Sequence, residues 1–143
     1  MWLHRWAWMN QRAGNASVYV ATRGQRVVGY YALATGGVER ANAPAEITKG
    51  GVPTQIPVLL LARLAVDERE QGSGLGRGLF VDALRRVLRV SEEVGFRALL
   101  IHARDESAKS FYLHFGEFAE SRTDPLHLLW LVKRIRQSHG SVG

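Results

Sequence analysis

The segment REQGSGLGRGLF, residues 69–80, has the composition of a ligand-binding turn, because glycine recurs at every second position through its middle. An apolar run precedes it and an amphipathic run follows it. A glycine-rich turn between a strand and a helix presents backbone N–H groups at the positive end of the helix, which favours a phosphate. The spacing matches neither GxxxxGK[ST] nor GxGxxG. It matches QxxGxG through Gln71, Gly74 and Gly76, so we expect an anion site here.

Tyr112 is the second residue that could take part in a reaction. It lies in ESAKSFYLHFG, a predicted short helix, where its phenol could donate a hydrogen bond or a proton to a leaving group. The competing interpretation is that its ring packs beside Phe111 and Phe115, which is the commoner role of an aromatic residue on a helix. The spacing alone therefore favours packing, and a catalytic role needs further support.

Periodicity predicts the elements that would position these residues. The expected strands are residues 17–23, 26–35, 58–67, 97–104 and 126–135, with a turn at Gly24 and a long loop at 36–57. The expected helices are the end of one at 2–12, closing at Gly14 with its tryptophans packed on the sheet, one from about 76 to 94, and a short one that Asp105 caps. On the long helix we expect one apolar stripe of Leu79, Phe80, Ala83, Leu84, Val87, Val90 and Val94, and an outward face with Asp82, Arg85, Arg86, Arg89 and Glu93. This order predicts an α+β domain with a mixed, mostly antiparallel sheet flanked by helices.

Composition limits the class of protein. A chain of 143 residues, 46% hydrophobic and 22% charged, suits one globular domain spanning residues 1–143. The lack of cysteine excludes disulfides and thiolate sites and fits a reducing, cytoplasmic setting. No apolar run approaches the roughly 20 residues that span a bilayer. The net charge of +6 favours an anionic partner, although the arginines are scattered and are equally consistent with a general richness in arginine.

The order of these parts resembles the GNAT superfamily of N-acetyltransferases. A strand reading LARLAVDE, the QxxGxG turn, a long helix, a strand and a tyrosine-bearing short helix follow one another as in that fold. The resemblance implies that acetyl-coenzyme A binds without a metal. The implied contacts with the coenzyme are Leu64, Ala65, Val66, Gln71, Gly72, Ser73, Gly74, Leu75, Gly76, Arg77 and Phe111. Tyr112 would stand near the sulfur as the catalytic residue.

Simple acid–base energetics limit what these residues could do in acetyl transfer. A phenol near pKa 10 facing a thiol near 8.5 is mismatched by ~2 kcal/mol, so Tyr112 would be a weak acid. No general base stands out; the candidates left open are His102, Glu39, Glu46 and Asp67. Deprotonating a lysine amine at pH 7 costs roughly 4.6 kcal/mol, whereas an α-amine costs about 1 kcal/mol. A site without a strong base therefore favours an α-amine.

Nearly the whole chain resembles one branch of the superfamily, the TacT-like toxins of toxin–antitoxin pairs. The segments that carry this resemblance are VVGYYALA, IPVLLLARLAVDEREQGSGLGRGL, AKSFYLHFG and TDPLHLLWLVKRIR. The branch implies acetylation of aminoacyl-tRNA, a ribbon-helix-helix antitoxin and a homodimer. Arg85, Arg86 and Arg89 of the long helix could contact the tRNA backbone, or they could form a solvated helix face.

Two other functions are compatible with the same sequence. The chain could be a GNAT enzyme for a small-molecule or protein amine, or a non-catalytic coenzyme A-binding subunit of a complex. The family usually begins with a further strand and helix, and the expected helix at residues 2–12 suggests that the first strand is missing, which would leave a sheet edge bare. The particular tRNA and amino acid are not encoded in any recognisable motif.

Overall fold

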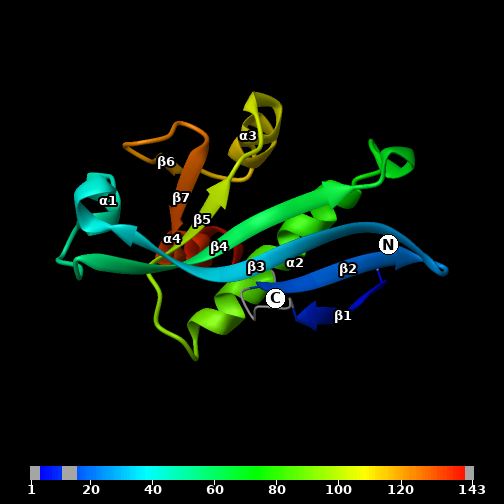
Figure 1. Ribbon diagram of the computed structural model, residues 1–143, viewed down its shortest axis with the longest axis horizontal. Coiled ribbons are helices and arrows are strands. Elements are labelled where there is room, and N and C mark those ends of the chain that lie inside the picture. Colours follow the sequence, from blue (N-terminus) through cyan, green and yellow to red (C-terminus); the bar gives the residue numbers. More distant parts are fainter. Residues whose placement is uncertain (1–3, 11–15, 141–143) are drawn as a thin grey trace.

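The computed structural model describes residues 4–10 and 16–140, which form one mixed sheet of seven strands flanked by helices (Figure 1). The strands are β1 (His4–Asn10), β2 (Ala16–Arg23), β3 (Arg26–Glu39), β4 (Gln55–Val66), β5 (Ala98–His102), β6 (Ala119–Glu120) and β7 (His127–Leu131). Their order in the sheet is β1-β2-β3-β4-β5-β7-β6, and only β4 and β5 pair in parallel. The predicted mixed, mostly antiparallel sheet is therefore confirmed.

Two short 3-10 helices and three of the four α-helices connect the strands, and α4 follows the last strand. They are η1 (Arg40–Asn42), α1 (Ala45–Thr48), η2 (Glu68–Glu70), α2 (Leu75–Ser91), α3 (Glu106–Leu113) and α4 (Val132–His139). In Figure 1, α2 crosses behind the sheet and α3 projects beyond the end of β5. None of the helices in the described ranges is long and apolar enough to cross a membrane.

Two apolar cores occupy the two faces of the sheet. The larger joins α2 and α4 to the strands, and most of the predicted apolar stripe lies in it: Leu79, Phe80, Ala83, Leu84 and Val87 are buried and Val90 packs against them. The prediction was wrong for Val94, which lies beyond the end of α2 and is 54% exposed. The smaller core lies under Ile47 of α1 on the opposite face. Burial of these stripes removes their apolar surface from water, which is the main force that places α2 against the sheet.

A close approach between β3 and α2 occurs at Gly29. A methyl group at this position would lie 2.8 Å from Leu79 Cδ1 and 3.1 Å from the Ala65 carbonyl oxygen. Only glycine leaves room for the helix to pack so close to the strand. The first turns of α2 are therefore held directly against β3 and β4.

The end of β4 runs free of β5. The two strands pair only between residues 58–61 and 98–101, while β4 continues to Val66. The pairing of β4 with β3 shifts register next to Leu61, so that Arg63 pairs with Ala32 and Ala62 is the extra residue. Such a bulge bends a strand. Beyond Leu61, one edge of the β4 backbone carries no β5 partner in the described structure.

Four further expectations were wrong. Residues expected to end a helix form β1 instead, because aromatic residues suit strands and the edge of β2 supplies a hydrogen-bonding partner. The sheet edge expected to be bare at β2 is covered by β1, and Trp2 and Gly14 lie outside the described residues. The expected loop at 36–57 is shorter because β3 and β4 extend into it and pair. The expected strand 126–135 divides into β7 and α4.

Candidate active site

The glycine-rich segment forms the turn between η2 and α2, as predicted. Gly72 and Gly74 have φ values of +84° and +87°, a conformation that residues with side chains rarely adopt. A Cβ atom at either position would meet no atom within 4 Å, so both residues face open space. Gly74 is the N-cap of the 17-residue helix α2 and supplies no side-chain acceptor to its first turn. The turn thus presents backbone N–H groups at the positive end of a helix, the arrangement that binds phosphates.

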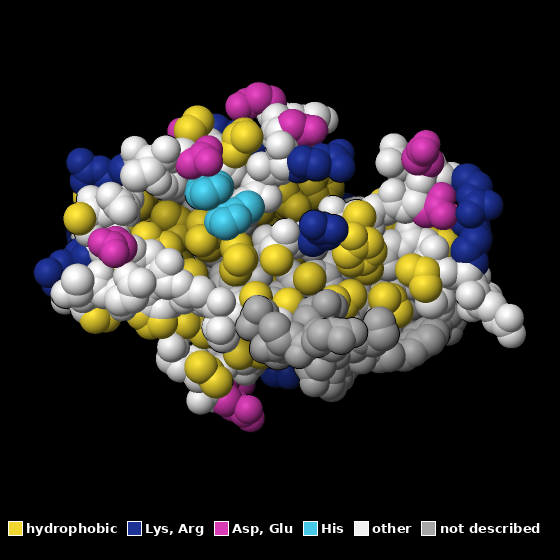
Figure 2. All heavy atoms as spheres, in the orientation of Figure 1, with side chains coloured by type: hydrophobic (Ala, Val, Ile, Leu, Met, Phe, Trp, Pro, Cys, Tyr) yellow, Lys and Arg dark blue, Asp and Glu magenta, His cyan; other side chains and the backbone are white. Residues whose placement is uncertain are grey.

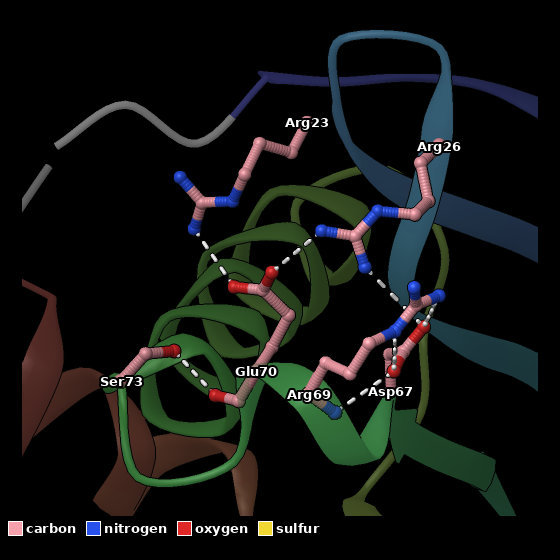
Figure 3. Close-up of polar contacts among 6 residues, drawn as sticks. All are labelled: Arg23, Arg26, Asp67, Arg69, Glu70 and Ser73. Carbon is pink, nitrogen blue, oxygen red and sulfur yellow. Dashed lines mark hydrogen bonds and ion pairs between the residues drawn. The ribbon is translucent and has the colours of Figure 1, made fainter.

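Charged residues hold this turn from the side of the β2–β3 hairpin (Figure 3). The Glu70 carboxylate accepts hydrogen bonds from Arg23 at 2.9 Å and from Arg26 at 3.0 Å. Asp67 caps η2 by accepting from the Arg69 N–H at 2.9 Å and also pairs with the Arg69 guanidinium. These hydrogen bonds with Arg69 hold the pKa of the Asp67 carboxyl below its usual range.

The expected coenzyme-contact residues of β4, Leu64, Ala65 and Val66, lie on the part of the strand without a β5 partner. Their backbone pairs with β3 on one side, with Leu64 opposite Tyr31 and Val66 opposite Gly29. On the other side their backbone has no β5 residue to pair with. Unpaired strand edges bind extended chains through backbone hydrogen bonds. A pantetheine arm is such a chain with two amide groups.

Tyr112 lies in α3, whose N-cap is Asp105 as predicted, with its carboxylate accepting from the Ala108 N–H at 2.9 Å. The Tyr112 side chain is 6% exposed, and its ring packs against Phe80 with a centroid distance of 5.1 Å. Burial raises the pKa of Tyr112 to about 12. Among the described residues no side chain hydrogen-bonds its hydroxyl. Packing therefore holds the ring while the phenol stays protonated and keeps its donor.

The remaining predicted coenzyme contacts are either exposed at the turn or packed against other residues. Gln71, Ser73 and Arg77 are exposed at the turn, and the Arg77 guanidinium lies 5.3 Å from the Phe115 ring centroid. Gly76 packs near Phe111, since a Cβ there would lie 3.8 Å from the phenyl ring. Leu75 is buried in the larger core.

The three arginines of α2 are not equivalent. Arg85 and Arg89 are exposed. Arg86 instead donates a hydrogen bond from Nε to the Tyr31 hydroxyl at 3.0 Å and lies 3.9 Å from the Tyr19 ring centroid. The Tyr31 hydroxyl in turn donates to Asp82 at 2.6 Å, so two polar residues expected on the outer face of the helix are part of its contact with the sheet.

The candidates for a general base lie in different places. Asp67 is engaged with Arg69, and Glu46 pairs with Arg134 at 2.8 Å beside α1. His102 ends β5 and stacks on His127 at a centroid distance of 3.8 Å, and burial together with His127 lowers its pKa. In Figure 2, histidine side chains lie together among apolar side chains on the face shown. Glu39 ends β3 opposite Gln55.

A hollow of about 770 Å³ lies elsewhere, between α1, the end of α2 and α4. None of the expected coenzyme contacts lines it. Arg97 in its wall donates to the Ile47 and Lys49 carbonyl oxygens, at 2.9 and 2.6 Å, and Arg136 donates to Ser91 at 2.7 Å. Much of the positive charge around this hollow is thus used in tying elements together. Within the described ranges no group of histidine and acidic residues could hold a metal ion.

No sequence pattern points to Glu70, Arg23 or Arg26, which the structure brings together across 44 and 47 residues of chain. Charged residues near a turn are usually solvated, and no periodic pattern links them. A signal of this kind would require a record of paired substitutions between the hairpin and the turn.

Comparison with known proteins agrees with this geometry. Residues 14–116 match the family described as acetyltransferase (GNAT) domain. A Mycobacterium tuberculosis protein named tRNA-acetylating toxin is 45% identical over 135 residues, covering 94% of this chain and 80% of that protein.

Solved structures of the toxin AtaT have the same fold. The structure of AtaT complexed with acetyl-methionyl-tRNAfMet superposes with a TM-score of 0.78 at 30% identity, covering 88% of this chain and 76% of that one. The structure of AtaTR bound with AcCoA gives a TM-score of 0.73 at 31% identity, with the same two coverages. With its glycine-rich turn, free β4 edge and tyrosine helix in the expected order, the chain belongs to the GNAT family of acetyltransferases.

Proposed function

We propose that this acetyltransferase transfers the acetyl group of acetyl-coenzyme A to the α-amine of an aminoacyl-tRNA, and that it is the toxin of a type II toxin–antitoxin pair. The observation that carries the proposal is the junction of the glycine-rich turn, the free edge of β4 and the buried Tyr112, in a chain 45% identical to a tRNA-acetylating toxin. Acetylated aminoacyl-tRNA cannot donate its α-amine in elongation, so translation would stop. This substrate would place the reaction in the cytoplasm.

The turn and the strand edge bind the two ends of the coenzyme in this proposal. Backbone N–H groups between Gly72 and Arg77 hold the diphosphate, where two glycines leave open space. The β4 edge from Leu64 to Val66 hydrogen-bonds the pantetheine arm. Phe111, which packs on Tyr112 at 5.2 Å between centroids, lies beside the arm. Bound in this way, the coenzyme supplies the acetyl group as a thioester.

Tyr112 supplies a hydrogen bond to the leaving sulfur. The neutral α-amine attacks the thioester carbonyl carbon, and the C–N bond forms. The C–S bond then breaks to release a thiolate, and the nitrogen loses one proton to solvent to give the amide. With its pKa raised to about 12, the Tyr112 phenol is ~3.5 pKa units weaker as an acid than a thiol near 8.5, or ~5 kcal/mol from full proton transfer. Tyr112 therefore stabilises the thiolate as a donor, and the thiolate takes its proton from solvent.

The surroundings of the reaction suit an amine that loses its proton at a small energetic cost. Two of the carboxylates considered as bases, Asp67 and Glu46, are engaged in ion pairs. An α-amine of pKa near 7.7–8 loses its proton at a cost of about 1 kcal/mol at pH 7, so it needs no strong base. This energetic difference supports an aminoacyl group over a lysine side chain as the acceptor.

The partners follow from the same assignment. The exposed Arg85 and Arg89 would contact the tRNA backbone, whereas Arg86 is engaged with Tyr19 and Tyr31. Solved neighbours include a KacTA–DNA complex and AtaT bound to the C-terminus of the antitoxin AtaR, both about 30% identical to this chain. They support an antitoxin partner; a ribbon-helix-helix domain in that partner and a homodimeric toxin are parts of the proposal.

The decisive experiment incubates the protein with acetyl-coenzyme A and total charged tRNA, and identifies acetylated aminoacyl groups by mass spectrometry. Free amino acids, polyamines and a lysine peptide are offered in parallel at equal concentration. We expect acetylation of the tRNA-borne α-amine only, with tRNA affinity falling by at least tenfold between 50 and 200 mM salt. Faster acetylation of a free amine, or coenzyme binding without turnover on any acceptor, would contradict the proposal.

A further inference from the structure

We propose that Glu70 is a positioning residue for coenzyme binding, because it ties the glycine-rich turn to the tip of the β2–β3 hairpin. The proposal rests on the acetyl-coenzyme A site described above and assigns a role to a carboxylate that would not itself touch the coenzyme. Figure 3 shows the Glu70 side chain directed at two arginines of the hairpin and its carbonyl oxygen directed at Ser73.

The side chain of Glu70 is held on both carboxylate oxygens. Oε1 accepts from Arg23 and Oε2 from Arg26, and the Glu70 side chain is only 9% exposed. A charged residue so little exposed is uncommon unless it is paired. The hydrogen bond from Arg23 holds the pKa of the Glu70 carboxyl below its usual range, and Arg26 acts in the same direction. Glu70 is therefore ionised and paired throughout the neutral range.

The backbone carbonyl of Glu70 accepts hydrogen bonds from the turn. Its carbonyl oxygen accepts from the Ser73 backbone N–H at 3.2 Å and from the Ser73 hydroxyl at 2.5 Å. Ser73 stands between Gly72 and Gly74, which have no side chains with which to anchor themselves. Glycine loses more conformational entropy on ordering than any other residue. A fixed acceptor at Glu70 reduces the disorder that the coenzyme phosphates would otherwise have to remove.

The hairpin is a firm support. Arg23 and Arg26 are paired residues that close the hairpin, with Gly24 at φ +65° in its turn. The same hairpin reaches the start of η2, because the Asp67 N–H donates to the Val28 carbonyl oxygen at 2.8 Å. Glu70 thus links the turn to strands that are already hydrogen-bonded to β4.

A role of Glu70 through its charge and a role in positioning the turn predict opposite effects of neutralising Glu70 on coenzyme binding. Arg23, Arg26 and Arg69 face two carboxylates in this cluster, so it carries one excess positive charge. Removing the negative charge of Glu70 makes the neighbourhood of the turn more positive. If Glu70 acted through charge alone, its neutralisation would strengthen binding of a polyanion. If Glu70 positions the turn, neutralisation weakens binding.

The test is Glu70→Gln, which keeps the size of the side chain and one carbonyl oxygen but loses the paired charge. We expect calorimetry to show at least a tenfold higher Kd for acetyl-coenzyme A, with kcat at saturating coenzyme within twofold of the wild type. The matched control is Glu46→Gln, which breaks the Arg134 ion pair beside α1 and should leave the Kd unchanged. A Kd for Glu70→Gln that is unchanged or lower overturns the proposal.

A second variant tests the same contact from the hairpin side. Arg26→Gln removes one of the two donors from a side chain that is 37% exposed, and we expect a Kd increase of three- to tenfold. In the double variant the Kd increase should be smaller than the product of the two single increases, because both substitutions break the same interaction. Full additivity overturns the proposal. Wild-type protein that does not bind acetyl-coenzyme A would instead refute the proposed function, so the two failures are distinguishable.

Discussion

The glycine-rich turn and Tyr112 are held in opposite ways. Charged side chains from a neighbouring hairpin fix the turn, and its glycines contribute only backbone. Tyr112 is fixed by the rings of Phe80 and Phe111, without a hydrogen bond to its hydroxyl from the described residues. One half of the site is thus organised by polar contacts and the other by packing.

The two kinds of support suit the turn and Tyr112 to different functions. A rigid backbone cradle suits the binding of phosphates, whose charge is the same before and after the reaction. A phenol whose donor is free suits a group whose charge develops only as the C–S bond breaks, since only interactions stronger in the transition state raise kcat. We therefore expect variants of the turn to change coenzyme affinity and variants of Tyr112 to change turnover.

The largest effect should come from Gly74→Val. A valine at φ +87° is strained, and its side chain would enter the open space where phosphates approach two or more N–H groups. Loss of two charge-assisted hydrogen bonds at ~1.5–3 kcal/mol each raises the Kd for acetyl-coenzyme A at least 100-fold. Calorimetry measures this change. Gly51→Val is the control, since Gly51 has φ +89° and open space but lies after α1; equal losses in both variants would show that strain alone is responsible.

Tyr112→Phe should have the next largest effect, confined to turnover. It keeps the packed ring and removes the donor, so kcat falls on the order of 100-fold while the Kd for acetyl-coenzyme A and the Tm stay near wild type. Tyr31→Phe provides the contrast, because its hydroxyl donates to the buried Asp82. That variant should lower the Tm and leave kcat within about threefold. Near-normal turnover of Tyr112→Phe would assign Tyr112 to packing alone.

The smallest expected change is with pH. At saturating acetyl-coenzyme A, kcat/KM for aminoacyl-tRNA should rise roughly 30-fold from pH 6 to pH 8 as an α-amine of pKa ~7.7 loses its proton, and then level off. Because the pKa of Tyr112 is raised to about 12, the phenol remains protonated and causes no fall up to pH 9.5. Initial rates of acetyl transfer across this range measure the profile. A fall between pH 8 and 9.5 would mean that the essential donor is more acidic than Tyr112.

The residues that hold the glycine-rich turn in place could not be predicted from the sequence, although the turn itself could. The turn itself, most of the stripe of α2 and the Asp105 cap follow from local spacing, and all three are found in the structure. The partners of Glu70 do not follow, because they come from a hairpin more than 40 residues away. Asp82 and Arg86 were expected to face solvent since a helix periodicity places them there; the Tyr31 hydroxyl supplies the partner that lets them pack inward.

The edge strand illustrates a different limit. The tryptophans of residues 2–12 have the spacing of a helix stripe and predicted the end of a helix, which was wrong for residues 4–10. The hydrogen-bonding edge of β2 decides in favour of β1. Such a choice depends on a partner strand and is not contained in the segment itself.

The contact at Gly29 has a consequence for how this protein tolerates change. Any side chain there presses at once on Leu79, near the start of α2, and on the carbonyl of Ala65, in the free edge of β4. Residue 29 lies on a strand to which we assign no role in the chemistry, yet a single added methyl group would disturb both surfaces that we propose to bind the coenzyme. In a saturation mutagenesis screen for loss of toxicity, this position would therefore tolerate as few substitutions as an active-site residue. The reason would be the close packing of α2 on β3 and not a part in the reaction.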